Sequence, residues 1–215
     1  MTKAEIRSLV KNYLPKNDKT NKYHPEVIDA TIERAFNQAY NKIFLKSPTE
    51  LDNYTVEYTN SGNGIDMQDD ANSGLIYATI PVGYVPLPDK ASGVRHVYSM
   101  TIAPSNSDYT DFIPMTRTEY DLMSEGVLSE NVRNKYGYVV KQDRIEIYGK
   151  AVTDVLDDLR MDILQLFREY SDTDVVNIPF GSDIELIQAV LALLGVVPPV
   201  DLKDDNAEVK TGNTE

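Results

Sequence analysis

The sequence predicts an α+β fold, because helical and strand-like patterns occupy separate parts of the chain instead of alternating. Apolar residues recur at helical spacing in residues 1–48, whereas residues 49–168 show the period of two that is typical of strands. Helical spacing returns in residues 180–195. We therefore expect an N-terminal helical hairpin, a β-rich middle and a buried C-terminal helix with an extended tail. We assign residues 1–200 to a single domain and residues 201–215 to a polar tail.

Two helices are predicted before the β-rich middle. The segment "TKAEIRSLVKNYL" (2–14) begins with Thr2 and Glu5, which have the spacing of a capping box. The next helix, in "HPEVIDATIERAFNQAYNKIFLKSP", carries Pro25 in its first turn and an apolar stripe at 3.6-residue spacing, and Pro48 closes it. Together these helices make the expected hairpin.

Strands are predicted where polar and apolar residues alternate. They fall at 53–59, 75–80, 93–102 and in a hairpin at 136–149 with its turn around Gln142 and Asp143. The polar segments 60–74 and 103–111 and the proline-rich segment 81–92 are interpreted as loops. Thr116 and Glu119 form a second capping box, which predicts a short helix between the strands.

Residues 152–170 fit two patterns. "VTDVLDDLRMDILQLFREY" places eight apolar residues on one helical face, and its Leu, Met, Arg, Asp and Gln content favours a helix. However, Leu159, Met161 and Ile163 also alternate as in a strand, and the preceding hairpin would accept another strand. We predict a strand at 159–165.

The last helix is predicted from a clear start and stop. Ser182 or Asp183 can cap it, and Gly195 ends it. Apolar residues cover most of its circumference, which predicts burial: Ile184, Leu186, Ile187, Val190, Leu191, Leu193 and Leu194.

The segment "EYSDTDVVNIPFGSD" (169–183) is the most acidic candidate site. Asp172 and Asp174 have the alternate spacing of calcium ligands, but the next alternate position is Val176. The apolar "VVNIPF" also interrupts the polar run. We therefore interpret this segment as a connector, in which Asp172 and Asp174 are solvated turn residues or contact a neighbouring subunit.

Other candidate sites lack the companions that their chemistry requires. His24 and His96 are far apart in the sequence, and neither has a second His or a Cys at ligand spacing. The loop 61–74 contains Asp66 and Asp70 at calcium-ligand spacing but lacks the glycine and glutamate of an EF-hand. Incidental binding of a cation by this loop therefore stays an alternative. We predict that the protein is not an enzyme and uses no cofactor or metal.

The composition of the chain excludes several kinds of partner and binding site. The formal net charge of −13 disfavours nucleic-acid binding through the overall field, and the absence of cysteine excludes disulfides and thiolate sites. The first residues lack the apolar core of a signal peptide, and no apolar run is long enough for a bilayer, so we expect no membrane association. The 14 tyrosines favour a protein with large contact surfaces.

Several segments resemble the head-to-tail connector, or neck-ring, proteins of short-tailed bacteriophages, especially the crAss-like phages of gut bacteria. These segments are "YHPEVIDATIERAFNQAYNKIF", "DFIPMTRTEYDLM" followed by "KYGYVVKQDRIEIYG", and "LRMDILQLFREYSDTDVVNIPFGSDIELIQAVLALLG". The resemblance covers most of the chain and includes no catalytic motif.

The resemblance implies a structural virion protein located in the neck or tail and assembled in the host cytoplasm. Such proteins form rings, commonly of twelve subunits, that join the portal to other neck or tail ring proteins around a DNA channel. The implied contacts with the portal or a neighbouring subunit lie at the junction between the domain and the tail, at Val197, Pro198, Pro199, Val200 and Leu202. The acidic composition is compatible with genomic DNA passing without specific binding.

The alternative is a carbohydrate- or cell-surface-binding module of a virion or bacterium. Tyrosine-rich strands and a calcium-binding loop would favour this alternative. The absence of tryptophan and of a signal peptide argues against it.

Overall fold

The computed structural model confirms the α+β class and divides into two compact units. It describes residues 1–14, 23–60, 64–70, 75–88, 91–102, 107–124, 136–148 and 158–196. Unit 1 comprises the described residues within Met1–Tyr40 and Tyr170–Glu215, and unit 2 is Asn41–Glu169. The two ends of the chain therefore build one unit, and the middle of the chain builds the other.

The helices of unit 1 begin and end as the sequence predicts. They are α1 (Lys3–Asn12), α2 (Pro25–Lys46), which continues into unit 2, and α5 (Asp183–Leu194). Thr2 and Glu5 form both hydrogen bonds of the capping box at α1. The Ser182 hydroxyl accepts a hydrogen bond from the Glu185 N–H, and Gly195 ends α5 at φ 69°, in the left-handed region that favours glycine.

Apolar side chains from all three helices form the core of unit 1. Phe36 of α2 contacts Phe180 edge-to-face, with ring centroids 5.9 Å apart. The predicted burial of the last helix is confirmed for Leu186, Ile187, Val190, Leu191 and Leu194. In contrast, Ile184 is exposed and Leu193 is half-buried, so one side of α5 is not covered within unit 1.

The first residues of the chain pair with the connector that precedes α5. The Val176 N–H donates to the Met1 carbonyl oxygen at 2.8 Å, and the Lys3 N–H donates to the Asp174 carbonyl oxygen at 3.2 Å. The buried Lys3 ammonium donates to the Tyr170 carbonyl oxygen at 2.7 Å. The predicted connector is thus an ordered part of unit 1.

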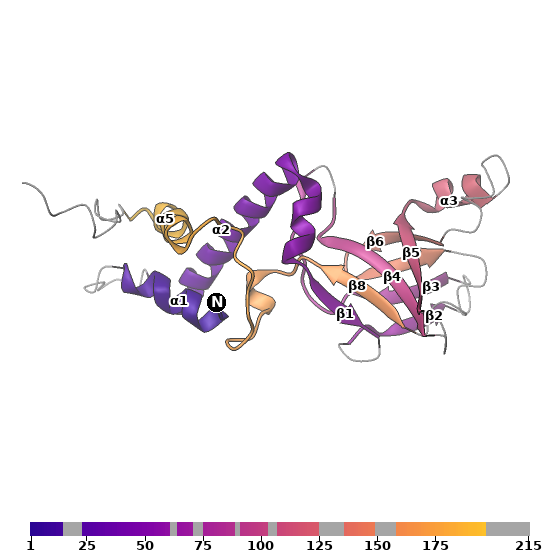
Figure 1. The fold of residues 1–215 in the computed structure, drawn as a ribbon, viewed down its shortest axis with the longest axis horizontal. Helices are drawn as coiled ribbons and strands as arrows, with labels where there is room; N and C mark the ends of the chain where they lie inside the picture. The colour runs from indigo at the N-terminus through magenta and orange to yellow at the C-terminus, as the bar shows by residue number, and fades with distance from the viewer. Residues whose placement is uncertain are drawn as a thin grey trace, which may run out of the picture. The chain divides into compact units, whose positions relative to one another are not determined.

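Unit 2 contains one curled eight-stranded sheet (Figure 1). Its strands are β1 (Val56–Thr59), β2 (Met67–Asp70), β3 (Leu75–Thr79), β4 (Val94–Ile102), β5 (Ser107–Pro114), β6 (Tyr136–Lys141), β7 (Arg144–Tyr148) and β8 (Leu159–Ile163). They lie in the order β1-β8-β4-β5-β6-β7-β3-β2. Among the strand pairs of the described residues, β5 and β6 are parallel and the other neighbours run antiparallel.

Chain connectivity requires the sheet to curl. Strands β1 and β2 are consecutive in the sequence but lie at opposite edges of the sheet, which would be about 33 Å apart if it were flat. The link from Thr59 to Met67 reaches at most about 29 Å when fully extended. Curling brings residues of β8 and β4 into one core with residues of β3 and β7, including Met161, Val97 and Ala78.

Most predicted strands and the short helix are confirmed. The ambiguous segment forms a strand, β8, and α3 (Arg117–Ser124) begins at the predicted capping box, where the Thr116 N–H donates to the Glu119 carboxylate. Asn53 and Tyr54, predicted as strand, instead end the 3₁₀ helix η1 (Pro48–Tyr54).

Two strands lie in segments predicted as loops. Strand β2 lies within the polar segment 60–74. Strand β5 begins at Ser107, within the polar segment 103–111. Both segments are rich in Asp, Ser, Asn or Gln, which disfavour strands. Their pairing with β3 and β4 supplies backbone hydrogen bonds that side-chain composition does not reveal.

Candidate functional site

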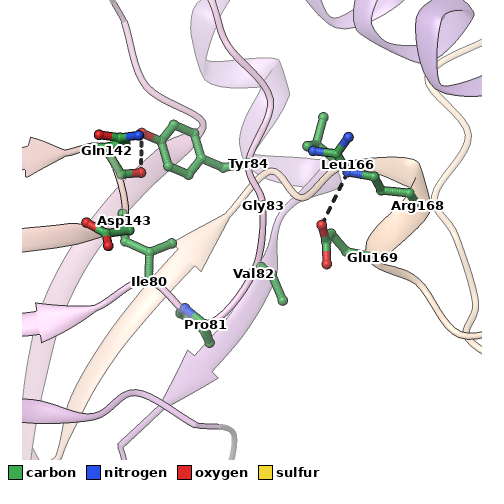
Figure 2. A pocket seen from close by; sticks show the side chains of 10 residues that line it. All are labelled: Ile80, Pro81, Val82, Gly83, Tyr84, Gln142, Asp143, Leu166, Arg168 and Glu169. Carbon is green, nitrogen blue, oxygen red and sulfur yellow. Dashed lines mark hydrogen bonds and ion pairs between the residues drawn. The ribbon is translucent and has the colours of Figure 1, made fainter. Parts of the chain in front are cut away.

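An open groove in unit 2 is the candidate functional site (Figure 2). It has a volume of about 460 Å³, which lies in the range of small ligand-binding pockets. Its walls come from the turn between β6 and β7 and from the 3₁₀ turn η4 (Phe167–Glu169) with the residue before it. Its lining residues are Ile80, Pro81, Val82, Gly83, Tyr84, Gln142, Asp143, Leu166, Arg168 and Glu169.

The base of the groove is formed by a segment, residues 80–87, that bends at Val82 and that we call the strap. At its start, the Ile80 N–H donates to the Asp143 carbonyl oxygen at 2.9 Å, which extends the β3–β7 ladder. Further along, Tyr84 forms an isolated antiparallel bridge with Gln165, just after β8. The strap therefore links β3, near one edge of the sheet, to the end of β8 near the other edge.

The β6–β7 turn has an unusual backbone conformation. Gln142 has φ 23°, the only positive φ of a non-glycine residue in the described ranges. The Tyr84 hydroxyl donates to the Gln142 carbonyl oxygen at 3.2 Å, which ties the turn to the strap. Positive φ in a side-chain-bearing residue costs free energy, so contacts of this kind help to hold the turn in place.

Gly83 leaves the centre of the groove open, as Figure 2 shows between the two walls. A Cβ atom at this position would lie 2.8 Å from Glu169 Oε1 and 3.1 Å from Leu166 Cδ1. The Leu166 N–H donates to the Gly83 carbonyl oxygen at 2.9 Å, which fixes the distance between strap and wall.

The groove combines apolar contacts with a net negative charge. Asp143 lies on one wall, and Arg168 and Glu169 lie on the other, with Arg168 Nε 3.4 Å from Glu169 Oε1. None of the lining residues is Ser, Thr, Cys, His or Lys. The arrangement thus offers hydrogen-bond acceptors, an aromatic ring and apolar surface, which suit binding.

A second polar cluster occupies the face of β1, β8 and β4 opposite the core. A β-bulge between Val94 and His96 directs both Arg95 and His96 away from the core. Arg95 Nε lies 3.1 Å from Asp52 Oδ1, and His96 Nε2 lies 3.2 Å from Asp52 Oδ2. His96 therefore contacts Asp52 within unit 2, and His24 belongs to unit 1, where its Nδ1 lies 3.9 Å from Glu26 Oε2.

Carboxylates and one arginine extend this cluster across β8. Arg160 contacts Glu57 Oε1 at 3.1 Å and Asp158 Oδ2 at 2.9 Å, and the Tyr98 hydroxyl donates to Glu57. Glu57 is the cross-strand neighbour of Asp162. Burial raises the pKa of the Asp162 carboxyl, a shift that His96 opposes and that the negative charge of Glu57 increases.

The acidic connector uses its carboxylates within the protein. Hydrogen bonds from the side chain and the N–H of Ser171 lower the pKa of Asp174, and the N–H donates to Asp174 Oδ2 at 2.7 Å. Asp172 Oδ1 lies 3.0 Å from Arg7 Nη1. In the described parts of the chain, no group of three or more His, Cys, Asp or Glu side chains is arranged to hold a metal ion.

The other predicted site residues are only partly described. In the acidic loop, the Gln68 amide donates to Asp66 Oδ2 at 3.4 Å, whereas residues 61–63 and 71–74 lie outside the described ranges. Val197, Pro198, Pro199, Val200 and Leu202, predicted to contact the portal or a neighbouring subunit, also lie outside the described residues.

Sequence reasoning missed the groove because its walls are distant in the sequence. The segment "PVGYVP" (81–86) has the composition of a loop between strands and carries no local signal of a site. A glycine between β-branched and aromatic residues is a signal of close backbone approach, which Gly83 makes to Leu166.

No protein-family model and no curated protein sequence matches this chain. Among the helices in the described ranges, none has both the length and the apolar composition needed to cross a membrane.

Proposed function

We propose that this chain is a structural virion protein that forms a ring in the neck of a short-tailed phage. The ring joins the portal to the tail and surrounds the channel for the genome. The resemblance that suggests this role involves α2, the segment from β5 to α3, the β6–β7 hairpin and the run from β8 to α5. These are framework elements of both units, as expected for a protein whose role is assembly.

The observation that carries the proposal is a largely apolar groove on unit 1, between α2 and α5. It has a volume of about 380 Å³ and is lined by Val27, Ala30, Thr31 and Leu193, with Glu26 and Arg34 beside them. Val27 is 43% exposed. Concave apolar surface with charged residues beside it is typical of protein–protein contacts. A closed ring requires two different contact faces on each subunit, and we assign one of them to this groove.

The partners follow from this role. They are further copies of the chain, twelve in a ring of the common size, the portal protein and other neck or tail ring proteins. A net charge of −13 repels DNA phosphates, which favours passage of the genome without specific binding. The tail residues 197–202 supply further contacts with the portal or a neighbouring subunit.

Mass measurement of the purified chain, alone and with a portal protein from the same genome, tests the proposal. We expect closed rings of about a dozen copies in electron micrographs, and co-purification with the portal. A chain that stays monomeric at high concentration with and without the portal would contradict the proposal. A monomer that binds glycans would support the alternative of a carbohydrate-binding module.

A charge in the α2–α5 groove tests the assigned face. Val27→Glu should weaken ring formation by about tenfold or more, because it places a carboxylate in an apolar contact. Gln38→Glu is the matched control, since it adds the same charge at an exposed polar position of α2. Equal ring formation by both variants would show that this groove is not a contact face.

A further inference from the structure

We infer that the groove at Gly83 binds an extended peptide segment of another polypeptide, through main-chain pairing with the strap and a basic side chain of the peptide. This inference goes beyond ring formation, since the groove belongs to unit 2 and is separate from the α2–α5 groove of unit 1. It rests on the backbone of the strap, the open centre of the groove and the charges on its walls.

The strap has a backbone edge that faces away from its partner strand. The Val85 N–H donates to the Leu164 carbonyl oxygen, and the Gly83 carbonyl oxygen accepts from the Leu166 N–H, both at 2.9 Å. In an antiparallel bridge with these bonds, the N–H and C=O of the central residue, Tyr84, point to the opposite side. Val82 lies at a bend, so the free edge of the strap is centred on Tyr84.

This edge is available for pairing. Within the described ranges, neither the Val82 N–H nor the Tyr84 N–H donates a hydrogen bond. Unpaired extended backbone is a template for an added strand, and many peptide-binding domains use such an edge for β-augmentation. A peptide paired here would align its backbone with the strap.

Glycine at residue 83 leaves the middle of the groove free of a side chain from the strap. A side chain there would point at Leu166 and Glu169, across the middle of the groove. Glycine within extended backbone is common where another backbone or a ligand approaches closely. The apolar side chains of Ile80 and Leu166, which also line the groove, would contact apolar side chains of the peptide.

The charges of the groove select the peptide. Asp143 and Glu169 stand on opposite walls against one positive charge, Arg168. The 3.4 Å contact joins an exposed Arg168 side chain to a partly exposed Glu169 side chain, and ion pairs near the surface are weak, so the contact competes little with a ligand. A lysine or arginine of the peptide would interact favourably with both carboxylates, whereas an acidic peptide would be repelled.

A displayed library of random nine-residue peptides, selected on the isolated chain, tests the inference. We expect enriched peptides to carry Lys or Arg between β-branched or aromatic residues. A synthetic copy of an enriched peptide should shift the amide resonances of Val82 and Tyr84. Calorimetry should show that Gly83→Leu, which fills the groove, weakens binding by about tenfold or more.

A second variant keeps the inference testable if Gly83→Leu does not fold. Asp143→Asn combined with Glu169→Gln leaves the groove open and should weaken binding by about fivefold, with less salt dependence than in the parent protein. Glu50→Gln, at an exposed position outside the groove, should leave binding unchanged.

Three outcomes would overturn the inference. One is a selection that enriches no peptide over background. Another is an enriched peptide that binds the folded groove variants as tightly as the parent protein, and the third is a preference for acidic peptides. Resonance shifts at Tyr84 with a glycan panel, but not with peptides, would assign the groove to sugars instead.

Discussion

The Arg7 guanidinium binds the Asp29 carboxylate through two parallel hydrogen bonds, Nε to Oδ1 at 2.7 Å and Nη2 to Oδ2 at 2.6 Å. Its remaining nitrogen, Nη1, lies 3.0 Å from Asp172 Oδ1. One arginine thereby connects α1, α2 and the acidic connector. The hydrogen bonds with Asp29 are the main reason that the pKa of Arg7 is raised.

Replacement of Arg7 by lysine should lower the free energy of unfolding by about 1 kcal/mol, because lysine cannot form the two-pronged contact with Asp29. The estimate is modest since both side chains are partly exposed. Urea denaturation measures the change. Arg34→Lys, at an exposed position on α2, is the control and should have little effect. Equal midpoints for the two variants would contradict a structural role for the pair.

Replacement of both Asp172 and Asp174 by asparagine should leave the protein folded. The stability of the variant should change less with pH in the acidic range than the stability of the parent protein. The folded state lowers the pKa of Asp174, so its carboxylate stabilises the fold above its ordinary pKa, near 4. That contribution is lost as pH falls through the lowered pKa. The melting temperatures of the double variant and the parent protein, measured between pH 3 and 7, should therefore converge at the acidic end of this range.

The same double variant tests the interpretation of the connector. If it failed to fold, and if Ca²⁺ raised the melting temperature of the parent protein, the segment would be a calcium site. We expect no effect of Ca²⁺ on either protein.

Asp162→Asn should stabilise the protein at pH 7. Burial raises the pKa of this carboxyl, so its charged form destabilises the folded state above the raised pKa. The destabilisation disappears as pH falls and the carboxyl protonates in the folded protein. The difference in melting temperature between variant and parent should thus be positive at pH 7 and shrink towards pH 4. A variant that is less stable at pH 7 would indicate that favourable contacts of the Asp162 carboxylate outweigh the cost of its burial.

Substitutions of Gln142 should separate backbone conformation from side-chain contacts. Glycine tolerates the positive φ at this position, so Gln142→Gly should be neutral or stabilising by up to about 1 kcal/mol. Gln142→Ile should destabilise by about 1–2 kcal/mol, because β-branched residues rarely adopt this conformation. Chemical denaturation of both variants provides the measurement, and the reverse order of stability would contradict the assigned conformation.

Local features of the fold were predictable from sequence. Each capping box involves residues three apart, so the spacing of Thr2 with Glu5 and of Thr116 with Glu119 predicts the start of a helix from local sequence alone. The apolar alternation of Leu159, Met161 and Ile163 likewise reflects burial on one face of a sheet.

Features that depend on distant pairing were not predictable. Strand β5 is stabilised by its register with β4 and β6, and β2 by β3, despite polar side chains. The groove forms only where Gly83 and Tyr84 lie beside residues that follow them by more than fifty positions in the sequence. No local pattern encodes such proximity, because it follows from the curl of the whole sheet.

The pairing of Met1 with Val176 has a consequence for synthesis on the ribosome. Unit 2 is continuous in sequence, so all its strands can emerge and pair while the chain is still being translated. The helices α1 and α2 must wait for the connector and α5 before their apolar faces are covered. The helices of unit 1 that precede unit 2 in the sequence are therefore made before it but are among the last elements to reach their native packing.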